Sequence, residues 1–314
     1  MDVSSRSSFG MALPQAALPT REYVDELRDA CLHAETLGFG SVWVTDHVRG
    51  SASFLEPFSS LAFCAAVTRS VRLGVAVAVS AVRSPVHLAQ AAASVDVVSG
   101  GRLELGLGSG APAIGPLFGI PPEHVFPRFR ASVTLMKRIW EQEEVTADDP
   151  HWQLHGWKAG LRPWQRPHPP LWIGARIPSA LRFAAEAGTG WIGAGSSSLG
   201  DFRRQVAVVR EHRENTGRGV DGFGIGKRVY LAVLDGQAGS PRQMAEVRTW
   251  FDHHYGDPSI ADRCAVVGSA DECAEQIAAL RRDGAQLVVL NPLAVTRSQM
   301  EIAAEIADRA GAAQ

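Results

Sequence analysis

The residues best suited to chemistry in this chain are Asp46 and His47, which directly follow a short apolar segment. A carboxylate and an imidazole at the end of a strand can hold a hydrogen-bond network beside a ligand and move a proton near neutral pH. The alternative is that His47 only satisfies the backbone of a loop. The pair therefore marks a candidate catalytic centre, with His47 as the proton donor or acceptor.

A second group, Gly174-Ala175-Arg176-Ile177, has the character of an anion site. It follows a short apolar segment and precedes Pro178-Ser179, which is typical of a helix start. Backbone N–H groups at a helix N-terminus carry partial positive charge and suit a phosphate, and Arg176 adds a charge-assisted contact. An ordinary turn between strand and helix is the alternative.

Gly108-Ser109-Gly110 would let the backbone approach a planar ring closely, with the Ser109 hydroxyl as a polar contact. The preceding glycine, Gly106, does not complete a dinucleotide-binding fingerprint, because the spacing of that motif is absent. These glycines therefore favour a ring-binding loop over a nucleotide-binding turn.

The segment 148–169 has no clear periodicity and carries Trp152, Trp157 and Trp164. The indoles either wall an apolar substrate pocket or tie down a long connection, and the sequence favours neither.

Several histidines are not expected to bind a ligand. His151 and His155 have a ligand-like spacing, but their segment is not helical in character and supplies no matching acid, so we expect no metal site. His253 and His254 stand at a polar helix end, where we expect them to be solvated.

The elements that position these residues alternate between strand and helix. The clearest unit is a buried strand (Leu73–Val79), a helix opened by Ser84-Pro85 and running to about Val98, and a second buried strand (Arg102–Gly108), which together form a right-handed βαβ unit. Further expected strands are Phe9–Leu13, Ser41–Thr45, Leu171–Ile173, Gly190–Gly193, Gly226–Leu234 and Gln286–Asn291. Further expected helices are Arg21–Leu37, Phe54–Arg69, Arg128–Gln142, Pro178–Ala187, Leu199–Thr216, Pro241–Tyr255, Ala270–Asp283 and Ser298–Ala310. This alternation predicts a (β/α)8 TIM barrel with inserted loops in preference to an open doubly wound sheet.

The composition sets the outer bounds. With 314 residues, of which 46% are hydrophobic and 20% charged, the whole span 1–314 is expected to form a single domain. A net charge of −2 gives no electrostatic case for nucleic acid or an anionic membrane. Four scattered cysteines are expected to be buried thiols, and no signal segment is evident, so we expect a cytoplasmic protein.

Four local patterns carry a family resemblance: LGFGSVWVTDHV (37–48), the stretch from Leu73 to Gly110, PPLWIGARIPSALRFAAEAGTGWIG (169–193) and GAQLVVLNP (284–292). Together they resemble the luciferase-like monooxygenase superfamily, which includes enzymes dependent on FMN and enzymes that use the deazaflavin coenzyme F-420. The resemblance spans nearly the whole chain, and the motifs follow the order of that family.

The resemblance implies a barrel with the cofactor ring at the C-terminal mouth, and usually a homodimer. In deazaflavin-using members the residues matching Asp46 and His47 contact the cofactor and face the substrate. The Ala76-Val77 bond aligns with a non-proline cis peptide beneath the ring in several members, a plain strand being the alternative. Cofactor contacts are likewise implied for Gly108-Ser109-Gly110, for residues 174–177, where Ala175 replaces a usual glycine, and for Gly195 and Ser196.

Two positions depart from the deazaflavin sugar-phosphate dehydrogenases of this family. Ala111 stands where some of them have a glutamate as proton donor, and Gly195-Ser196-Ser197 stands where a lysine is expected. Oxidation of glucose 6-phosphate is therefore not expected.

The leading hypothesis is an oxidoreductase that passes hydride between coenzyme F-420 and an organic substrate, either a small molecule or a peptide. The first alternative is an FMN-dependent monooxygenase, in which reduced flavin reacts with oxygen. The second is a cofactor-free structural or binding member of the family. The substrate depends on the loops 48–57, 111–127, 148–169 and 255–268, where the sequence shows only size and polarity.

Overall fold

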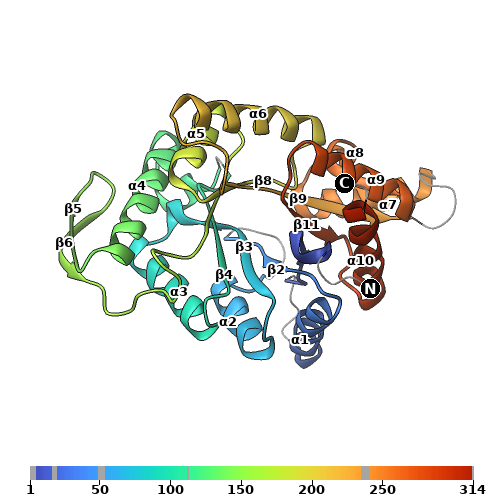
Figure 1. Cartoon of the computed structure of the whole chain (residues 1–314), viewed down its shortest axis with the longest axis horizontal. Helices are drawn as coiled ribbons and strands as arrows, with labels where there is room; N and C mark the ends of the chain where they lie inside the picture. The colour runs from blue at the N-terminus through green and yellow to red at the C-terminus, as the bar shows by residue number, and fades with distance from the viewer. Residues whose placement is uncertain (1–4, 16–19, 49–53, 112, 235–240, 313–314) are drawn as a thin grey trace.

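The computed structural model describes residues 5–15, 20–48, 54–111, 113–234 and 241–312. Residues 49–53 of one expected substrate loop, and residue 112 of another, lie outside the described residues. Within the described ranges, eight parallel strands close into a barrel surrounded by helices, which confirms the predicted (β/α)8 architecture (Figure 1). The barrel strands are β1 (Phe9–Ala12), β2 (Ser41–Val44), β3 (Arg72–Val79), β4 (Leu103–Gly108), β7 (Leu171–Gly174), β8 (Gly190–Gly193), β9 (Gly224–Val233) and β11 (Leu287–Pro292).

The barrel closes because β9 pairs with two neighbours. Its first residues pair with β8, Gly224 lying opposite Gly190, and its middle pairs with β11. The remaining strands follow in the order β11, β1, β2, β3, β4, β7, β8. A short extra strand, β10 (Ala265–Gly268), pairs with the end of β9.

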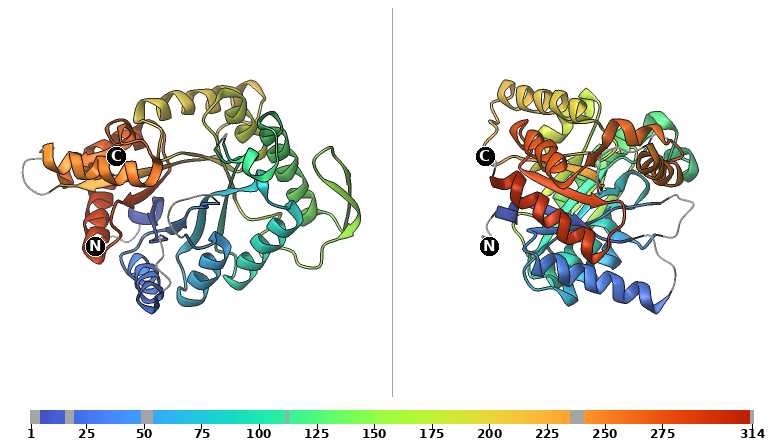
Figure 2. Two further views of the ribbon diagram at one scale, coloured as in Figure 1. Left: turned by 180° about the vertical axis from the view of Figure 1, so that it is seen from behind. Right: turned by 90° about the vertical axis from the view of Figure 1, so that its right-hand side faces the viewer.

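Helices cover the outside of the barrel (Figures 1 and 2). They are α1 (Arg21–Thr36), α2 (Pro57–Val67), α3 (Pro85–Val98), α4 (Pro122–Glu141), α5 (Pro178–Ala187), α6 (Leu199–Asn215), α7 (Pro241–Tyr255), α8 (Ser259–Cys264), α9 (Ala270–Arg282) and α10 (Arg297–Ala312). Short 3-10 turns lie at Ser5–Ser8, Ser80–Val82 and Gly115–Phe118. Both α6 and α9 begin with a capping box, in which the side chain of Ser198 or Ser269 and a carboxylate three residues later satisfy the first N–H groups.

Large aromatic side chains fill the barrel interior. Trp43 on β2 is 2% exposed and lies between strands that carry glycine beside it. A Cβ added at Gly74 would come within 2.3 Å of the Trp43 ring, and one at Gly10 within 2.5 Å. The edge of Trp172 on β7 meets Trp43 at 6.4 Å between ring centroids. These indoles form a packed floor beneath the mouth, as expected of a small barrel.

The structure adds elements that the sequence pattern did not predict. After α4 comes an antiparallel hairpin of β5 (Glu144–Asp148) and β6 (Gln153–Lys158), which projects from the side of the barrel (Figure 1). Only its second strand lies within the segment 148–169 that was expected to be irregular. The segment 255–268, expected to be a loop, contains α8 and β10. In addition, α4 begins at Pro122 and not at Arg128, because two prolines in its first turns are compatible with helical backbone while obscuring the sequence pattern.

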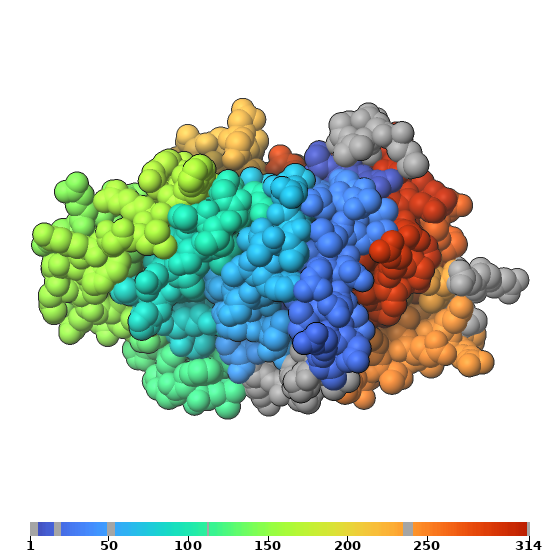
Figure 3. Space-filling view, turned by 90° about the horizontal axis from the view of Figure 1, so that it is seen from below, coloured from blue at the N-terminus to red at the C-terminus, as the bar shows by residue number. Residues whose placement is uncertain are grey.

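The outer face formed by α1, α2 and α3 is continuous in the space-filling view, where the three helices lie side by side next to α10 (Figure 3). All four cysteines are buried free thiols, as predicted, and those of Cys31 and Cys64 lie 2.9 Å apart between α1 and α2. Among the described helices, none has the length and apolar character needed to cross a membrane.

Candidate active site

The predicted site residues meet at one end of the barrel. Asp46 and His47 follow β2, Gly108 ends β4, and Gly174 ends β7. Because the strands are parallel, their carboxyl ends form a single mouth. The predicted architecture of the site is therefore present, while the roles of the individual residues stay predictions.

A cavity of about 180 Å³ opens in this mouth between β1, β2, β9, β11 and α7. Its aromatic lining consists of Trp43, His47, Phe54, Tyr230, Trp250, His254 and Tyr255, with Ala76 from β3 and Asn291 from β11 beside them. The cavity is thus mainly apolar, with a few polar groups converging on it, as is typical of a small-molecule site.

His47 lies in this cavity with its ring stacked on Phe54, 3.9 Å between centroids. Loss of solvent around the imidazole, followed by the charges of Arg228 and His254, lowers its pKa from 6.5 to about 4. Because His47 is an exposed residue overall, we expect a smaller shift than a buried imidazole would show. In either case the ring is neutral at pH 7 and has a nitrogen lone pair available to accept a proton.

Asp46 faces away from the cavity and is fully engaged. Its carboxylate accepts hydrogen bonds from the guanidinium of Arg83 at 2.9 Å and from the backbone N–H of Val79 at 2.9 Å. The side chain is only 3% exposed. Asp46 therefore joins the end of β2 to the end of β3 and fixes the backbone from which His47 projects, which suits a positioning role better than direct proton transfer.

The peptide bond between Ala76 and Val77 is cis, as the family resemblance implied. The pairing of β3 with β4 is irregular at this point, between Val75 and Ala78. The Val77 side chain reaches the ends of the two next strands. A Cβ at Gly108 would lie 2.5 Å from it, and one at Gly174 would lie 3.1 Å from it. The two glycines therefore leave the space that Val77 occupies in the mouth.

Ser109 and Gly110 continue from the end of β4. The Ser109 hydroxyl donates to the carbonyl of Gly110 at 3.3 Å, and Gly110 has a φ of 82°. A side chain at Gly110 would be strained in this backbone and would also meet Val79 and Ile114. The loop Gly108-Ser109-Gly110 thus lies at the mouth of the barrel, as the sequence analysis predicted.

The residues after β7 and β8 form a cluster of hydrogen-bond donors. Arg176 donates to the Ser196 hydroxyl at 2.5 Å, and Gln205 of α6 donates to the Arg176 carbonyl at 3.2 Å. The first N–H groups of α5 have no capping side chain, because Ile177 occupies the N-cap position. An exposed guanidinium, a hydroxyl and uncapped N–H groups together suit a phosphate.

A buried lysine holds the backbone next to this cluster by hydrogen bonds. Lys227 on β9 is 1% exposed, and its ammonium group donates to the carbonyls of Ala194 and Ser197, the latter at 2.8 Å. Burial lowers its pKa from 10.5 to about 7. Lys227 thereby holds the backbone that carries Gly195 and Ser196, and Gly195 itself packs against the Tyr230 ring.

The sequence reasoning missed much of the cavity wall. Arg228 and Tyr230 share one face of β9, and Trp250, His254 and Tyr255 come from the end of α7. A usable signal was present, because two adjacent basic residues, Lys227 and Arg228, are unusual within an otherwise apolar strand.

The expectation that His254 is solvated was wrong. His254 is half-buried and stacks on Trp250 at 3.8 Å between ring centroids, and burial lowers its pKa.

The three tryptophans of the segment 148–169 do not line this cavity. Trp152 packs under the Arg128 guanidinium at 3.7 Å and donates to the Arg128 carbonyl, while Trp164 is 65% exposed. Trp152 therefore serves the second of the two roles considered, tying a long connection to the barrel. In the described part of the chain no cluster of three potential metal-ligating side chains occurs.

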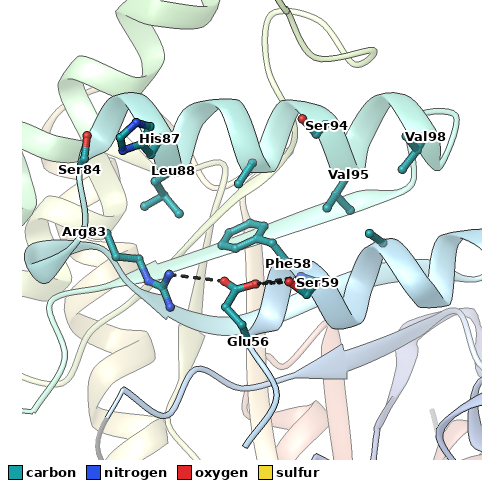
Figure 4. Close-up of a pocket in the computed structure, with 12 residues that line it drawn as sticks. Glu56, Phe58, Ser59, Arg83, Ser84, His87, Leu88, Ser94, Val95 and Val98 are labelled. Carbon is teal, nitrogen blue, oxygen red and sulfur yellow. Dashed lines mark hydrogen bonds and ion pairs between the residues drawn. The ribbon is translucent and has the colours of Figure 1, made fainter. Parts of the chain in front are cut away.

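A larger groove of about 560 Å³ lies on the outside of the barrel between α2 and α3 (Figure 4). In the close-up, Arg83 and Glu56 point toward one another, 3.4 Å apart, at one end of the groove, and Val98 lies at the other. Helices flank this groove, and the strand ends that carry His47, Gly108 and Gly174 do not contribute to it. The mouth cavity is therefore the better candidate for catalysis.

Residues 6–261 match the luciferase-like monooxygenase family. The chain belongs to that family. This agrees with the closed barrel and with the resemblance carried by the sequence motifs.

Two relatives illustrate the range of cofactors in the luciferase-like family. The chain is 28% identical over 178 residues to the oxygenase component of a flavin-dependent trigonelline monooxygenase from Acinetobacter baylyi, covering 54% of this chain and 48% of that protein. It is 32% identical over 205 residues to an F420-dependent glucose-6-phosphate dehydrogenase from Kineococcus radiotolerans, covering 62% of this chain and 59% of that protein. The match thus spans about half to three-fifths of the length of these relatives.

The fold extends over the full length of a solved luciferase-like structure. An F420-dependent secondary alcohol dehydrogenase, solved with an F420-acetone adduct, superposes with a TM-score of 0.81 over 96% of this chain and 98% of that chain. The two sequences are 17% identical, so this likeness shows the fold alone.

Proposed function

We propose that this luciferase-like protein is an oxidoreductase that transfers hydride between coenzyme F-420 and an organic substrate bound in the mouth cavity. The observation that carries the proposal is the neutral imidazole of His47 beside a mainly apolar cavity at the carboxyl ends of the strands. When bound, the deazaflavin ring would supply the position that gives or takes the hydride.

His47 would move the proton that accompanies the hydride. When a hydroxyl-bearing carbon is oxidised, the hydride leaves carbon and the hydroxyl proton must go to a base. A neutral imidazole in hydrogen-bond reach of the substrate is suited to accept that proton and to return it in the reverse direction. Asp46 would contribute by fixing the β2 and β3 ends through Arg83 and Val79.

Two groups of residues would hold the coenzyme. Ala76, Val77 and the loop Gly108-Ser109-Gly110 would contact the ring, since they form the part of the mouth next to the cavity. The donor cluster at residues 174–177 with Gly195 and Ser196 would bind the phosphate, because every polar group presented there by side chains or uncapped backbone is a donor.

An FMN-dependent monooxygenase is the second candidate, supported by the similarity to the flavin-dependent trigonelline monooxygenase. The same donor cluster suits the phosphate of either cofactor. A cofactor-free binding protein is a third reading, which the preserved donor cluster disfavours.

The test is an equilibrium titration of the purified protein with F-420 and with FMN, each oxidised and reduced. We expect saturable binding of F-420 at least tenfold tighter than FMN. Preferred binding of FMN would favour the monooxygenase, and binding of neither would favour the cofactor-free reading.

The same titration, carried out on an Arg176 variant, tests whether the cofactor phosphate binds at this residue. Arg176→Ala should weaken F-420 binding by about 1–3 kcal/mol, the scale of a charge-assisted hydrogen bond. Arg182→Ala, an exposed arginine farther along α5, is the matched control and should have little effect. With a cofactor fragment that lacks phosphate, the effect of Arg176→Ala should vanish. An equal loss for fragment and whole cofactor would place Arg176 at the ring or in the fold.

A further inference from the structure

Among the described residues that line the mouth cavity, one side chain is permanently charged, that of Arg228, and no aspartate or glutamate accompanies it. Arg228 projects from β9 two residues before Tyr230, and its guanidinium lies 4.9 Å from the centre of the Tyr230 ring. The cavity therefore combines aromatic walls with a single positive charge.

Apart from its contact with the Tyr230 ring, the Arg228 guanidinium has no hydrogen-bond or ion-pair partner in the described part of the chain. Its Nε atom is buried without a hydrogen bond, and Arg228 takes part in none of the ion pairs found there. Arg83, by contrast, binds Asp46 through both carboxylate oxygens. An arginine with a buried, unsatisfied nitrogen is costly unless a ligand supplies the missing acceptor.

The groups that face Arg228 do not neutralise it. The pKa of His47 and the pKa of His254 are both lowered, so both imidazoles are neutral at pH 7. Burial raises the pKa of Tyr230, and its hydroxyl is hydrogen-bonded to that of Tyr255, so the phenol stays protonated. The described lining of the cavity thus carries a net positive charge near neutral pH.

We propose that Arg228 determines substrate specificity by binding a carboxylate, so that the substrate is a small aromatic or otherwise planar carboxylic acid. A guanidinium makes its strongest pairs with planar two-oxygen anions, and the aromatic side chains of Phe54, Trp250 and Tyr255 suit a flat apolar body. The volume of about 180 Å³ suits a compact molecule. This inference rests on the proposed function, since it names the substrate class of that same site.

The anion could instead be a phosphate, carried by a phosphorylated substrate or by the cofactor. Two observations favour a carboxylate on the substrate. The donor cluster at Arg176 and Ser196 is not part of the cavity lining and already suits the cofactor phosphate. Of the cavity-lining residues that the structure describes, Arg228 is the sole cation, with no second cation or helix start among them to share a dianion.

The experiment measures binding of para-fluorobenzoate and of the neutral para-fluorobenzamide by fluorine NMR, with and without F-420 present. We expect the wild-type protein to bind the acid about ten- to a hundredfold tighter than the amide, as a charge-assisted pair implies. Arg228→Met should abolish this preference, and Arg228→Lys should keep part of it. Arg242→Met, at a 90% exposed arginine on α7, is the matched control and should keep all of it.

Three results would overturn the inference: equal or absent binding of the two probes by the wild-type protein, a preference that survives in a folded Arg228→Met variant, or loss of F-420 binding in that variant. Inorganic phosphate that displaces the benzoate at equal concentration would also overturn it, in favour of a phosphorylated ligand. Failure of the wild-type protein to bind F-420 would contradict the proposed function alone, because the preference between acid and amide is also measured without the cofactor.

Discussion

At the scale of single residues, His47 is the side chain whose properties depend most on its surroundings. Its ring is stacked on Phe54 and faces two other basic groups, Arg228 and His254. These neighbours disfavour the imidazolium form and lower the pKa of His47. The imidazole is therefore unprotonated at neutral pH and can accept a proton. Sequence alone identified the residue but could not supply its protonation state, since the neighbours come from β9 and α7.

His47→Ala should lower turnover by roughly 10²–10⁴-fold, the usual contribution of a general acid or base. F-420 affinity should change much less, because the phosphate and the ring are held elsewhere. Added imidazole should restore part of the activity. Steady-state kinetics together with a cofactor titration check this, and nearly full turnover in the variant would show that His47 is structural.

The lowered pKa of His47 should also change how the free energy of unfolding depends on pH. The unfolded chain has an imidazole pKa near 6.5 and the folded chain a value near 4, so between these pH values the unfolded state binds more protons. The free energy of unfolding therefore falls as the pH falls from 6.5 towards 4, and this contribution is fully present above 6.5. We expect His47→Gln to lose less stability than the wild type between pH 7 and pH 5.

Urea unfolding at the two pH values measures this difference. The matched control is His155→Gln, which changes an exposed histidine on the hairpin. Equal acid losses for the wild type and His47→Gln would show that the imidazole titrates alike in the folded and unfolded chains.

At the scale of elements, the β5–β6 hairpin packs against α4 through Trp152 and does not line the mouth cavity. Trp152→Ala should cost roughly 1–3 kcal/mol of stability, less than the loss of a fully buried tryptophan, because the Trp152 ring packs under Arg128 and its N–H is hydrogen-bonded. Binding of cofactor and of the carboxylate probe should be unchanged. A large loss of binding without a loss of stability would instead place the hairpin at the site.

The elements were predictable where local pattern and tertiary context agree. The helices at Pro178–Ala187 and Pro241–Tyr255 match their predicted bounds, because proline starts and apolar periodicity are local signals. The β5–β6 hairpin was not predicted, since only Val145 and Ala147 in β5 are buried and the flanking prolines and indoles mask so short an alternation.

The candidate site was predictable in part for the same reason. Strand ends point to the mouth, so His47, Gly108 and Gly174 could be placed from sequence. The wall supplied by α7 depends on packing between distant elements, which no local pattern records. Arg228 is recognisable in the sequence as a basic residue in an apolar strand, but its place in the cavity wall depends on the same packing.

At the scale of the whole molecule, the homodimer implied by the family resemblance stays a prediction. Sedimentation equilibrium should give about twice the chain mass of 33.6 kDa at micromolar concentration. The mass of a single chain over the whole concentration range would contradict it.

Under the proposed function, the barrel mouth would be one continuous site: the residues after β7 and β8 would bind the phosphate, β3 and β4 would support the cofactor ring, and the aromatic cavity beside His47 would hold the substrate. The most direct measurement is a crystal structure of the protein saturated with F-420. We predict the deazaflavin ring against Val77 and Gly108, the phosphate at Arg176 and Ser196, and the cavity at His47 and Arg228 left open to the exposed face of the ring. A ring bound away from this mouth, or a phosphate held at Arg228, would contradict the account.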